Sequence, residues 1–174
     1  MDIIPPVKVA RFEQLEPGDL FIFMDRVEKS YAIKTQQPRN GDRSQMVLLG
    51  PVFPQDVSES AIVGWQPVTT LSFGKNYSIL LPTDSKSWSL SRLDQTSVCL
   101  AIADGEAYVC TNGAAYARDY FRCFVEVGTG KILERSPPGE IAYTTDWEIA
   151  VLSAKHPPRT ILKYPLAGTP AQAN

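Results

Sequence analysis

The stretch that decides the fold is Val98-Cys99-Leu100-Ala101-Ile102-Ala103-Asp104-Gly105-Glu106-Ala107-Tyr108-Val109-Cys110-Thr111. Two mostly apolar runs flank an Asp-Gly dipeptide, which is the strongest short-range signal for a β-hairpin with a two-residue loop. Such a loop places Cys99 directly opposite Cys110. Counted outward from the loop, this pair is hydrogen bonded, with Cα atoms about 5.5 Å apart. The sequence therefore predicts neighbouring thiols on two antiparallel strands.

Short apolar or alternating runs bounded by Gly, Pro, Asn or Asp recur along the rest of the chain, and this pattern is typical of strands. The predicted strands are Leu20–Met24, Tyr31–Thr35, Gln45–Leu49, Ala61–Val68, Tyr77–Leu81, Val98–Ala103, Glu106–Thr111, Phe121–Val127, Lys131–Glu134, Trp147–Leu152 and Thr160–Tyr164. No window carries a long apolar stripe at helical spacing, and 14 prolines oppose long helices. The segment Ala114–Tyr120 predicts a helix of one or two turns. The expected fold is mainly β, with antiparallel barrel or sandwich-like sheets and at most short helices.

A chain of 174 residues suits one compact domain, here 1–166, followed by a polar C-terminal tail at 167–174. An alternative is two related small β modules, 1–85 and 86–166. Each half contains a hairpin, a further strand, and a connection with Gly or Pro that leads into a segment with Trp. The residues of the two halves match too poorly to decide between these organisations.

One turn near the start of the chain has a clear physical basis. In Glu16-Pro17-Gly18-Asp19, Pro fixes φ at the second position and Gly supplies a positive φ at the third, which is the pattern of a type II turn. The run Leu20–Met24 that follows is apolar on both faces, which predicts a central strand. Phe12 and Leu15 are spaced to pack into one side of the same core.

Charge and composition make several classes of function unfavourable. Seventeen basic and 19 acidic side chains give a net charge of −2, which makes nucleic-acid binding an unfavourable hypothesis. There is no secretory signal at the start and no apolar run near the ~20 residues that cross a bilayer, so no membrane association is expected. An odd count of three cysteines suits a reducing compartment, and the predicted localisation is cytoplasmic.

The residues capable of metal or acid–base chemistry are few. Cys99, Cys110, Cys123 and the single His156 are too far apart in sequence for the close ligand pairs of a structural zinc site. We expect no metal and no cofactor. Buried thiols are the favoured reading, with a facultative disulfide between Cys99 and Cys110 as the alternative. His156 is expected in a solvated turn, although any histidine-dependent mechanism would have to use it.

Catalytic and phosphate-binding motifs are absent from the sequence. Gly128-Thr129-Gly130-Lys131 has the composition of a glycine-rich phosphate loop, but it lies between two predicted strands. A hairpin turn is the favoured interpretation of this segment.

Aromatic and basic residues in predicted loops are the candidate contact residues. They are Trp88, Tyr116, Arg118, Tyr120, Arg39 and Arg43. Trp88 lies in Ser87–Ser91, a predicted exposed edge strand with serines rather than lysines, and such an edge must be covered, charged or paired. Arg39 and Arg43 lie in a basic loop that also contains Lys34. A solvated hairpin tip is favoured there over a contact with phosphate or an acidic partner.

The sequence therefore favours a non-enzymatic binding or protein-interaction module that contacts a protein partner or a second copy of itself. The alternative is a small hydrolase-like enzyme whose site is assembled from residues distant in sequence. That alternative requires His156 or a cysteine to meet a carboxylate in a concave pocket.

Overall fold

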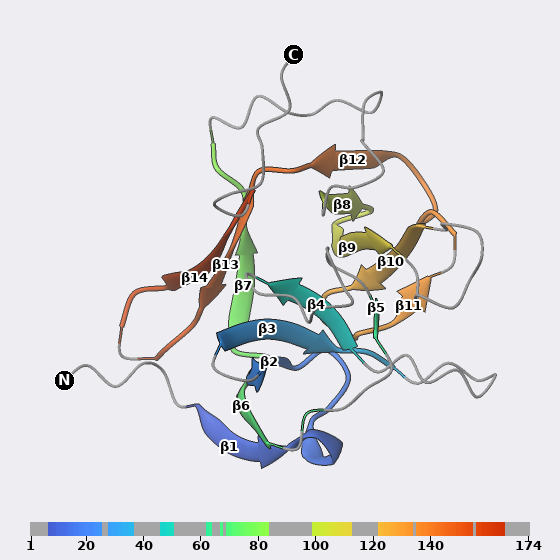
Figure 1. Ribbon diagram of the computed structural model, residues 1–174. Coiled ribbons are helices and arrows are strands. Elements are labelled where there is room, and N and C mark those ends of the chain that lie inside the picture. The colour runs from blue at the N-terminus through green and yellow to red at the C-terminus, as the bar shows by residue number, and fades with distance from the viewer. Residues whose placement is uncertain are drawn as a thin grey trace.

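In the described part of the chain, the fold consists of three antiparallel β-sheets and one short 3₁₀ helix, η1 (Phe12–Gln14) (Figure 1). The computed structural model describes residues 7–25, 28–36, 46–50, 62–63, 67, 69–83, 99–112, 122–133, 135–154 and 156–165. Within these ranges, no helix has the length and apolar character needed to cross a lipid bilayer.

Sheet A has the strand order β1-β6-β2-β3-β4-β5. Its strands are β1 (Lys8–Arg11), β2 (Leu20–Asp25), β3 (Glu28–Lys34), β4 (Met46–Gly50), β5 (Ile62–Val63) and β6 (Thr69–Gly74). Sheet B has the order β11-β10-β9-β8-β12, with β8 (Cys99–Ala103), β9 (Glu106–Asn112), β10 (Arg122–Glu126), β11 (Ile132–Leu133) and β12 (Ile141–Thr144). Sheet C has the order β14-β13-β7, with β7 (Tyr77–Leu80), β13 (Trp147–Val151) and β14 (Arg159–Tyr164).

The prediction of a mainly β fold with antiparallel, sandwich-like sheets is confirmed. The sheets are open rather than closed into a barrel, because among the described strands each sheet ends in two edge strands. A central core joins the three sheets. Leu20 and Ile33 enter it from sheet A, Leu100 from sheet B, and Ile149 from sheet C, and all four are fully buried.

The hairpin prediction around Asp104 and Gly105 is confirmed in every pair. β8 and β9 are paired with Cys99 opposite Cys110 and Ala103 opposite Glu106. Asp104 has φ of 50° and Gly105 has φ of 83°. Two consecutive positive φ values define the type I′ turn, whose twist matches that of the flanking strands.

The first turn of the chain is also confirmed. Gly18 has φ of +87°, and the N–H of Asp19 donates to the carbonyl of Glu16 over 3.0 Å. β2 lies in the interior of sheet A, as its two apolar faces predict. One of these faces carries Phe21, which packs against Phe12 of η1 with ring centroids 5.7 Å apart in an edge-on arrangement.

Hydrogen bonds at two turns join the three sheets. One turn contains Gly18, and the other connects β10 to β11. The N–H of Gly18 donates to the carbonyl of Lys34 over 2.8 Å, and the N–H of Gln36 donates to the carbonyl of Gly130 over 2.8 Å. The hydroxyl of Tyr77 lies 2.9 Å from the carbonyl oxygen of Gly18 and 3.2 Å from that of Val127. We call this set of contacts the junction, because it joins sheet A to the β10–β11 turn of sheet B through a side chain of sheet C.

The junction explains two glycines. A Cβ atom on Gly18 would lie 2.3 Å from the carbonyl oxygen of Gly128, and one on Gly130 would lie 2.3 Å from that of Lys34. Both contacts are with backbone, which cannot rotate away as a side chain can. The hairpin interpretation of residues 128–131 is confirmed, since the turn joins β10 to β11.

The strand predictions missed three described strands: β1, β6 and β12. These strands are only four to six residues long, and such short runs are easily assigned to loops. The predicted strand Ala61–Val68 is wrong at Pro67, which lies outside any strand, whereas β5 covers Ile62–Val63. The predicted helix Ala114–Tyr120, the predicted strand Ser87–Ser91 and the tail 167–174 lie outside the described residues.

We predict that Gly130→Ala destabilises the protein much more than Gly105→Ala. Both glycines have positive φ, but a Cβ on Gly105 meets nothing within 4 Å. Gly105→Ala should therefore cost only the left-handed conformation, about 1–2 kcal/mol. Gly130→Ala adds a backbone clash and should cost roughly 3 kcal/mol or more. Urea denaturation of both variants measures the difference, and equal losses would contradict the close packing of the junction.

We predict that Tyr77→Phe lowers the free energy of unfolding by about 1–2 kcal/mol, because it leaves two carbonyl groups without their hydroxyl donor. Burial, assisted by the negative charge of Asp19, raises the pKa of Tyr77 above its usual value of 10.0. The folded state therefore favours the neutral phenol. The neutral phenol stabilises the fold fully below pH 10, and this contribution is lost as the pH rises above 10. Denaturation should show the variant losing less stability than the wild type above pH 10. A parallel loss in both proteins would contradict this assignment.

Candidate functional site

The structure does not describe the six contact residues that the sequence predicts. Trp88, Tyr116, Arg118, Tyr120, Arg39 and Arg43 all lie outside the described residues. The candidate site is therefore built from the part of the chain that the structure describes.

The cysteines are divided between the two faces of sheet B. Cys99 and Cys110 are 0% and 2% exposed and lie in the apolar cluster on one face with Phe124, which is paired with Cys110. Cys123 is paired with Thr111, one position further along, so its side chain points to the other face and packs against the central core. All three cysteines are thiols. Because of this division, the three sulfur atoms do not converge on one point.

Two titratable groups with a shifted pKa, Lys34 and Glu148, take part in structural contacts. The Nζ of Lys34 donates to the carbonyl of Phe12 over 2.9 Å, and partial burial lowers the pKa of this lysine. The Nζ of Lys163 lies 2.9 Å from Oε1 of Glu148, and the hydroxyl of Thr160 donates to Oε2 over 2.7 Å. These hydrogen bonds, that of Lys163 first, lower the pKa of Glu148. Both groups hold neighbouring strands or turns in place.

His156 is exposed on the connection between β13 and β14, as the sequence predicts. Within the described ranges, no three His, Cys, Asp or Glu side chains are arranged to hold a metal ion.

A row of apolar side chains crosses one face of sheet A at its β1 edge. Val9 of β1 is directly opposite Leu71 of β6, and Leu71 is directly opposite Ile22 of β2. Met24 lies two residues beyond Ile22 and therefore projects from the same face. Val9 is 74% exposed, Met24 60% and Leu71 42%, whereas Ile22 is buried at the inner side of the row. We call these four residues the apolar row.

The apolar row borders a hollow where β2 and β6 separate. The two strands are paired up to Ile22 and Leu71, and beyond these residues β2 remains paired with β3 while β6 remains paired with β1. The hollow has a volume of about 440 Å³. Its lining residues among those described are Ile22, Phe23, Met24, Pro67, Thr69, Thr70 and Leu71. None of these side chains titrates near neutral pH, so the hollow offers apolar contact and threonine hydroxyls rather than acid–base chemistry.

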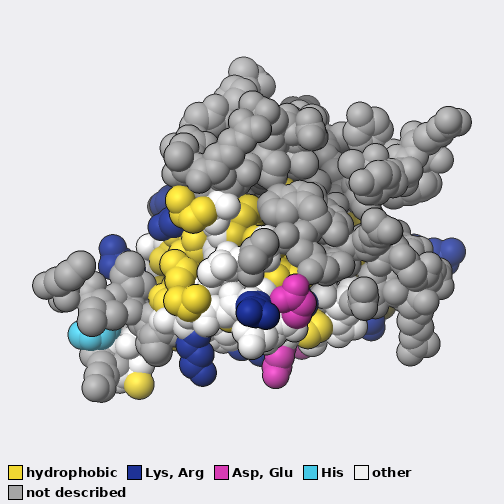
Figure 2. Space-filling model, turned by 60° about the horizontal axis from the view of Figure 1, so that its bottom comes forward, with side chains coloured by type: hydrophobic (Ala, Val, Ile, Leu, Met, Phe, Trp, Pro, Cys, Tyr) yellow, Lys and Arg dark blue, Asp and Glu magenta, His cyan; other side chains and the backbone are white. Residues whose placement is uncertain are grey.

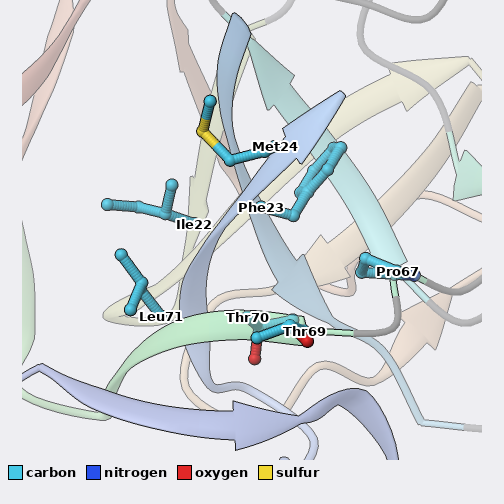
Figure 3. A pocket seen from close by; sticks show the side chains of 7 residues that line it. All are labelled: Ile22, Phe23, Met24, Pro67, Thr69, Thr70 and Leu71. Atoms are coloured by element: carbon cyan, nitrogen blue, oxygen red, sulfur yellow. The ribbon is translucent and has the colours of Figure 1, made fainter. Parts of the chain in front are cut away.

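The side chains around the hollow are arranged on two sides of the strands. Figure 3 shows Ile22, Met24 and Leu71 projecting together on one side of β2 and β6, with Phe23 and Pro67 on the other. Basic groups flank the row. Lys29 is paired with Met24 and lies over the ring of Tyr31 at 5.1 Å, and Arg11 follows Val9 by two residues on the same face. Figure 2, in which the side of the molecule bearing β1 comes forward, shows hydrophobic side chains exposed beside Lys and Arg side chains.

Sequence reasoning missed the apolar row, although one signal for it was present. Leu71 and Phe73 alternate with Thr70 and Ser72 and precede Gly74, which is the period-two pattern of a half-buried strand. That pattern identifies a strand but assigns Leu71 to the protein interior. The exposure of Leu71 depends on what covers the sheet at that point, which no local pattern contains.

Comparisons with protein-family models, with curated proteins and with solved structures found no match to this chain.

We predict that Cys123 reacts with iodoacetamide before Cys99 and Cys110 in the folded protein. Cys123 is partly exposed whereas the other two are buried, and a thiol must reach solvent to be alkylated. Peptide mass spectrometry after timed labelling measures the three rates, with urea-unfolded protein as the control in which the rates should converge. Equal rates in the folded protein would contradict this description of sheet B.

Proposed function

We propose that this chain is a non-enzymatic protein-binding module and that the apolar row is its contact surface. One observation carries the proposal. Of the five large hydrophobic side chains that are most exposed among the described residues, three, Val9, Leu71 and Met24, lie together on adjacent strands. Scattered exposed apolar residues are ordinary, but a contiguous group of them on a soluble surface is characteristic of an interaction site.

The form of the surface suits a polypeptide. β-Structure holds the row rigidly, so that little conformational entropy is lost when a partner covers it. The hollow between β2 and β6 can receive an apolar side chain of a partner, and Thr69, which lines it and is exposed, offers a hydroxyl at its rim. An anchor residue in such a pocket is the usual centre of a binding hot spot.

We predict that Leu71→Lys weakens partner binding by about ten- to a hundredfold, because burial of one leucine side chain contributes about 1.5–3 kcal/mol. The matched control is Leu80→Lys, since Leu80 is 38% exposed on β7 of sheet C, away from the row. The protein bound by the wild type and by Leu80→Lys is identified by mass spectrometry, purified, and titrated against all three chains by calorimetry. Equal affinities for Leu71→Lys and Leu80→Lys would overturn the proposed surface.

A further inference from the structure

The β1 edge of sheet A has an open hydrogen-bonding side. β1 is the terminal strand of the sheet, and among the described strands it is paired only with β6 (Figure 1). The hydroxyl of Thr70 in β6 donates to the carbonyl of Ala10 over 3.0 Å, whereas the N–H of Arg11 donates to Oε1 of Gln14 over 2.9 Å, outside the ladder. Successive residues of a strand direct their N–H and C=O groups to opposite sides. Val9, like Arg11, therefore directs its main-chain groups away from β6.

The open side is a short docking window centred on Val9. Because the N–H of Arg11 is already donated to Gln14, the ladder of an added strand ends at Val9 and continues only toward Val7. The side chain of Val7 packs against the central core, so Val7 and Val9 share one face, as alternation along the strand requires. An added antiparallel strand supplies both an acceptor for the Val9 N–H and a donor for its carbonyl.

The strand pair at this edge carries two cations and no carboxylate. β1 has the sequence Lys-Val-Ala-Arg, and β6 has the sequence Thr-Thr-Leu-Ser-Phe-Gly. Lys8 and Arg11 are exposed, and among the described residues neither takes part in an ion pair. The carboxylate nearest in sequence, on Glu13 of η1, comes after the end of the strand. The chain as a whole has a net charge of −2, so the positive charge is a local property of the edge.

We propose that the β1 edge binds an extended acidic segment of a partner protein, which adds to sheet A as an antiparallel strand. The inference rests on the proposed function, because it assigns the chemistry of the partner at the Val9 end of the apolar row. Charge complementarity selects this occupant. A second copy of β1 would bring cations to an edge that is already cationic. An anionic lipid surface would attract the same cations but has no main-chain amides to pair with Val9.

The register fixes where the partner carries its charges. When one partner residue lies opposite Val9, the next residue lies opposite Lys8 and the residue two positions earlier lies opposite Arg11. The following apolar position lies opposite Val7. From its N-terminus, the partner segment is therefore acidic, unrestricted, apolar, acidic and apolar. The contact with Arg11 uses its side chain alone, so it leaves the hydrogen bond to Gln14 intact.

A synthetic peptide tests this pattern on the full chain. The probe is acetyl-Gly-Ser-Glu-Ser-Val-Glu-Val-Ser-Gly-amide, titrated by calorimetry, and its charge control has Lys in place of both Glu residues. The acidic peptide should bind the wild type, and the basic peptide should bind roughly tenfold more weakly or worse, because both charge pairs become repulsive.

N-methylation of the peptide separates strand addition from simple charge attraction. A methyl group on the nitrogen of the first Val removes the donor to the Val9 carbonyl, and should lower affinity by at least about fivefold. The matched control is a methyl group on the nitrogen of the Ser before it, whose N–H points away from β1. That peptide should bind as the unmodified one does.

Charge reversal in the protein provides the reciprocal measurement. The double variant Lys8→Glu, Arg11→Glu should lose roughly tenfold in affinity for the acidic peptide and gain affinity for the basic one. The matched control is Arg135→Glu, which changes an exposed cation on the connection between β11 and β12 of sheet B. All these positions are exposed, so the melting temperatures should stay close to that of the wild type.

The acidic-strand assignment is overturned if the acidic peptide does not bind the wild type or binds no better than the basic one. It is also overturned if both N-methylated peptides bind equally, if the double variant behaves as Arg135→Glu does, or if the chain binds phosphatidylserine vesicles and not the peptide. These results differ from a failure of the proposed function. A purified partner whose binding depends on Leu71 but not on Lys8 and Arg11 removes only the acidic strand. Peptide binding that depends on Lys8 and Arg11, with partner binding unchanged in Leu71→Lys, removes only the role of Leu71.

Discussion

The arrangement of the three sheets depends on main-chain groups that meet at two glycine turns. At the junction, carbonyl groups of the Gly18 turn and of the β10–β11 turn share the hydroxyl of Tyr77, which comes from the third sheet. Hydrogen bonds of this kind satisfy main-chain groups that the packing of the three sheets partly removes from water. Only glycine allows the backbones to approach so closely, because a Cβ on Gly18 or Gly130 would overlap a carbonyl oxygen. A hydrogen-bond requirement, rather than apolar packing alone, thus fixes how the sheets meet.

A second tie joins sheets A and C through the core. Tyr164 of β14 stacks on Trp147 of β13, with ring centroids 4.1 Å apart, and its hydroxyl donates to the carbonyl of Leu49 in β4. Complete burial raises the pKa of Tyr164, so the phenol remains a neutral donor. The indole Nε1 of Trp147 is buried and has no hydrogen-bond partner among the described residues. These two aromatic residues fill the core rather than forming part of an exposed surface.

On the face of sheet A that contributes to the central core, burial is uneven among the described residues. Leu20 and Ile33 are fully buried against the other sheets, whereas Leu71, Met24 and Val9 on the same face are exposed. Among the described strands, the row is exposed at the β1 edge of the sheet, where β2 and β6 are no longer paired beyond Ile22 and Leu71. The proposed binding surface therefore depends on how far the described strands cover this face of sheet A.

Local features were set by the sequence alone. Asp104-Gly105 determines its hairpin because few residues tolerate two consecutive positive φ values, and the pairing of Cys99 with Cys110 follows by counting. Pro17-Gly18 determines its turn for a similar reason, and the two apolar faces of β2 predict its central place. The tertiary structure decided the rest. Leu71 is exposed while Phe73 of the same strand is buried, and Gly130 lies against Lys34. Both facts depend on contacts between segments far apart in the chain. Turn geometry is encoded within a few residues, whereas exposure depends on which distant strands cover a given face.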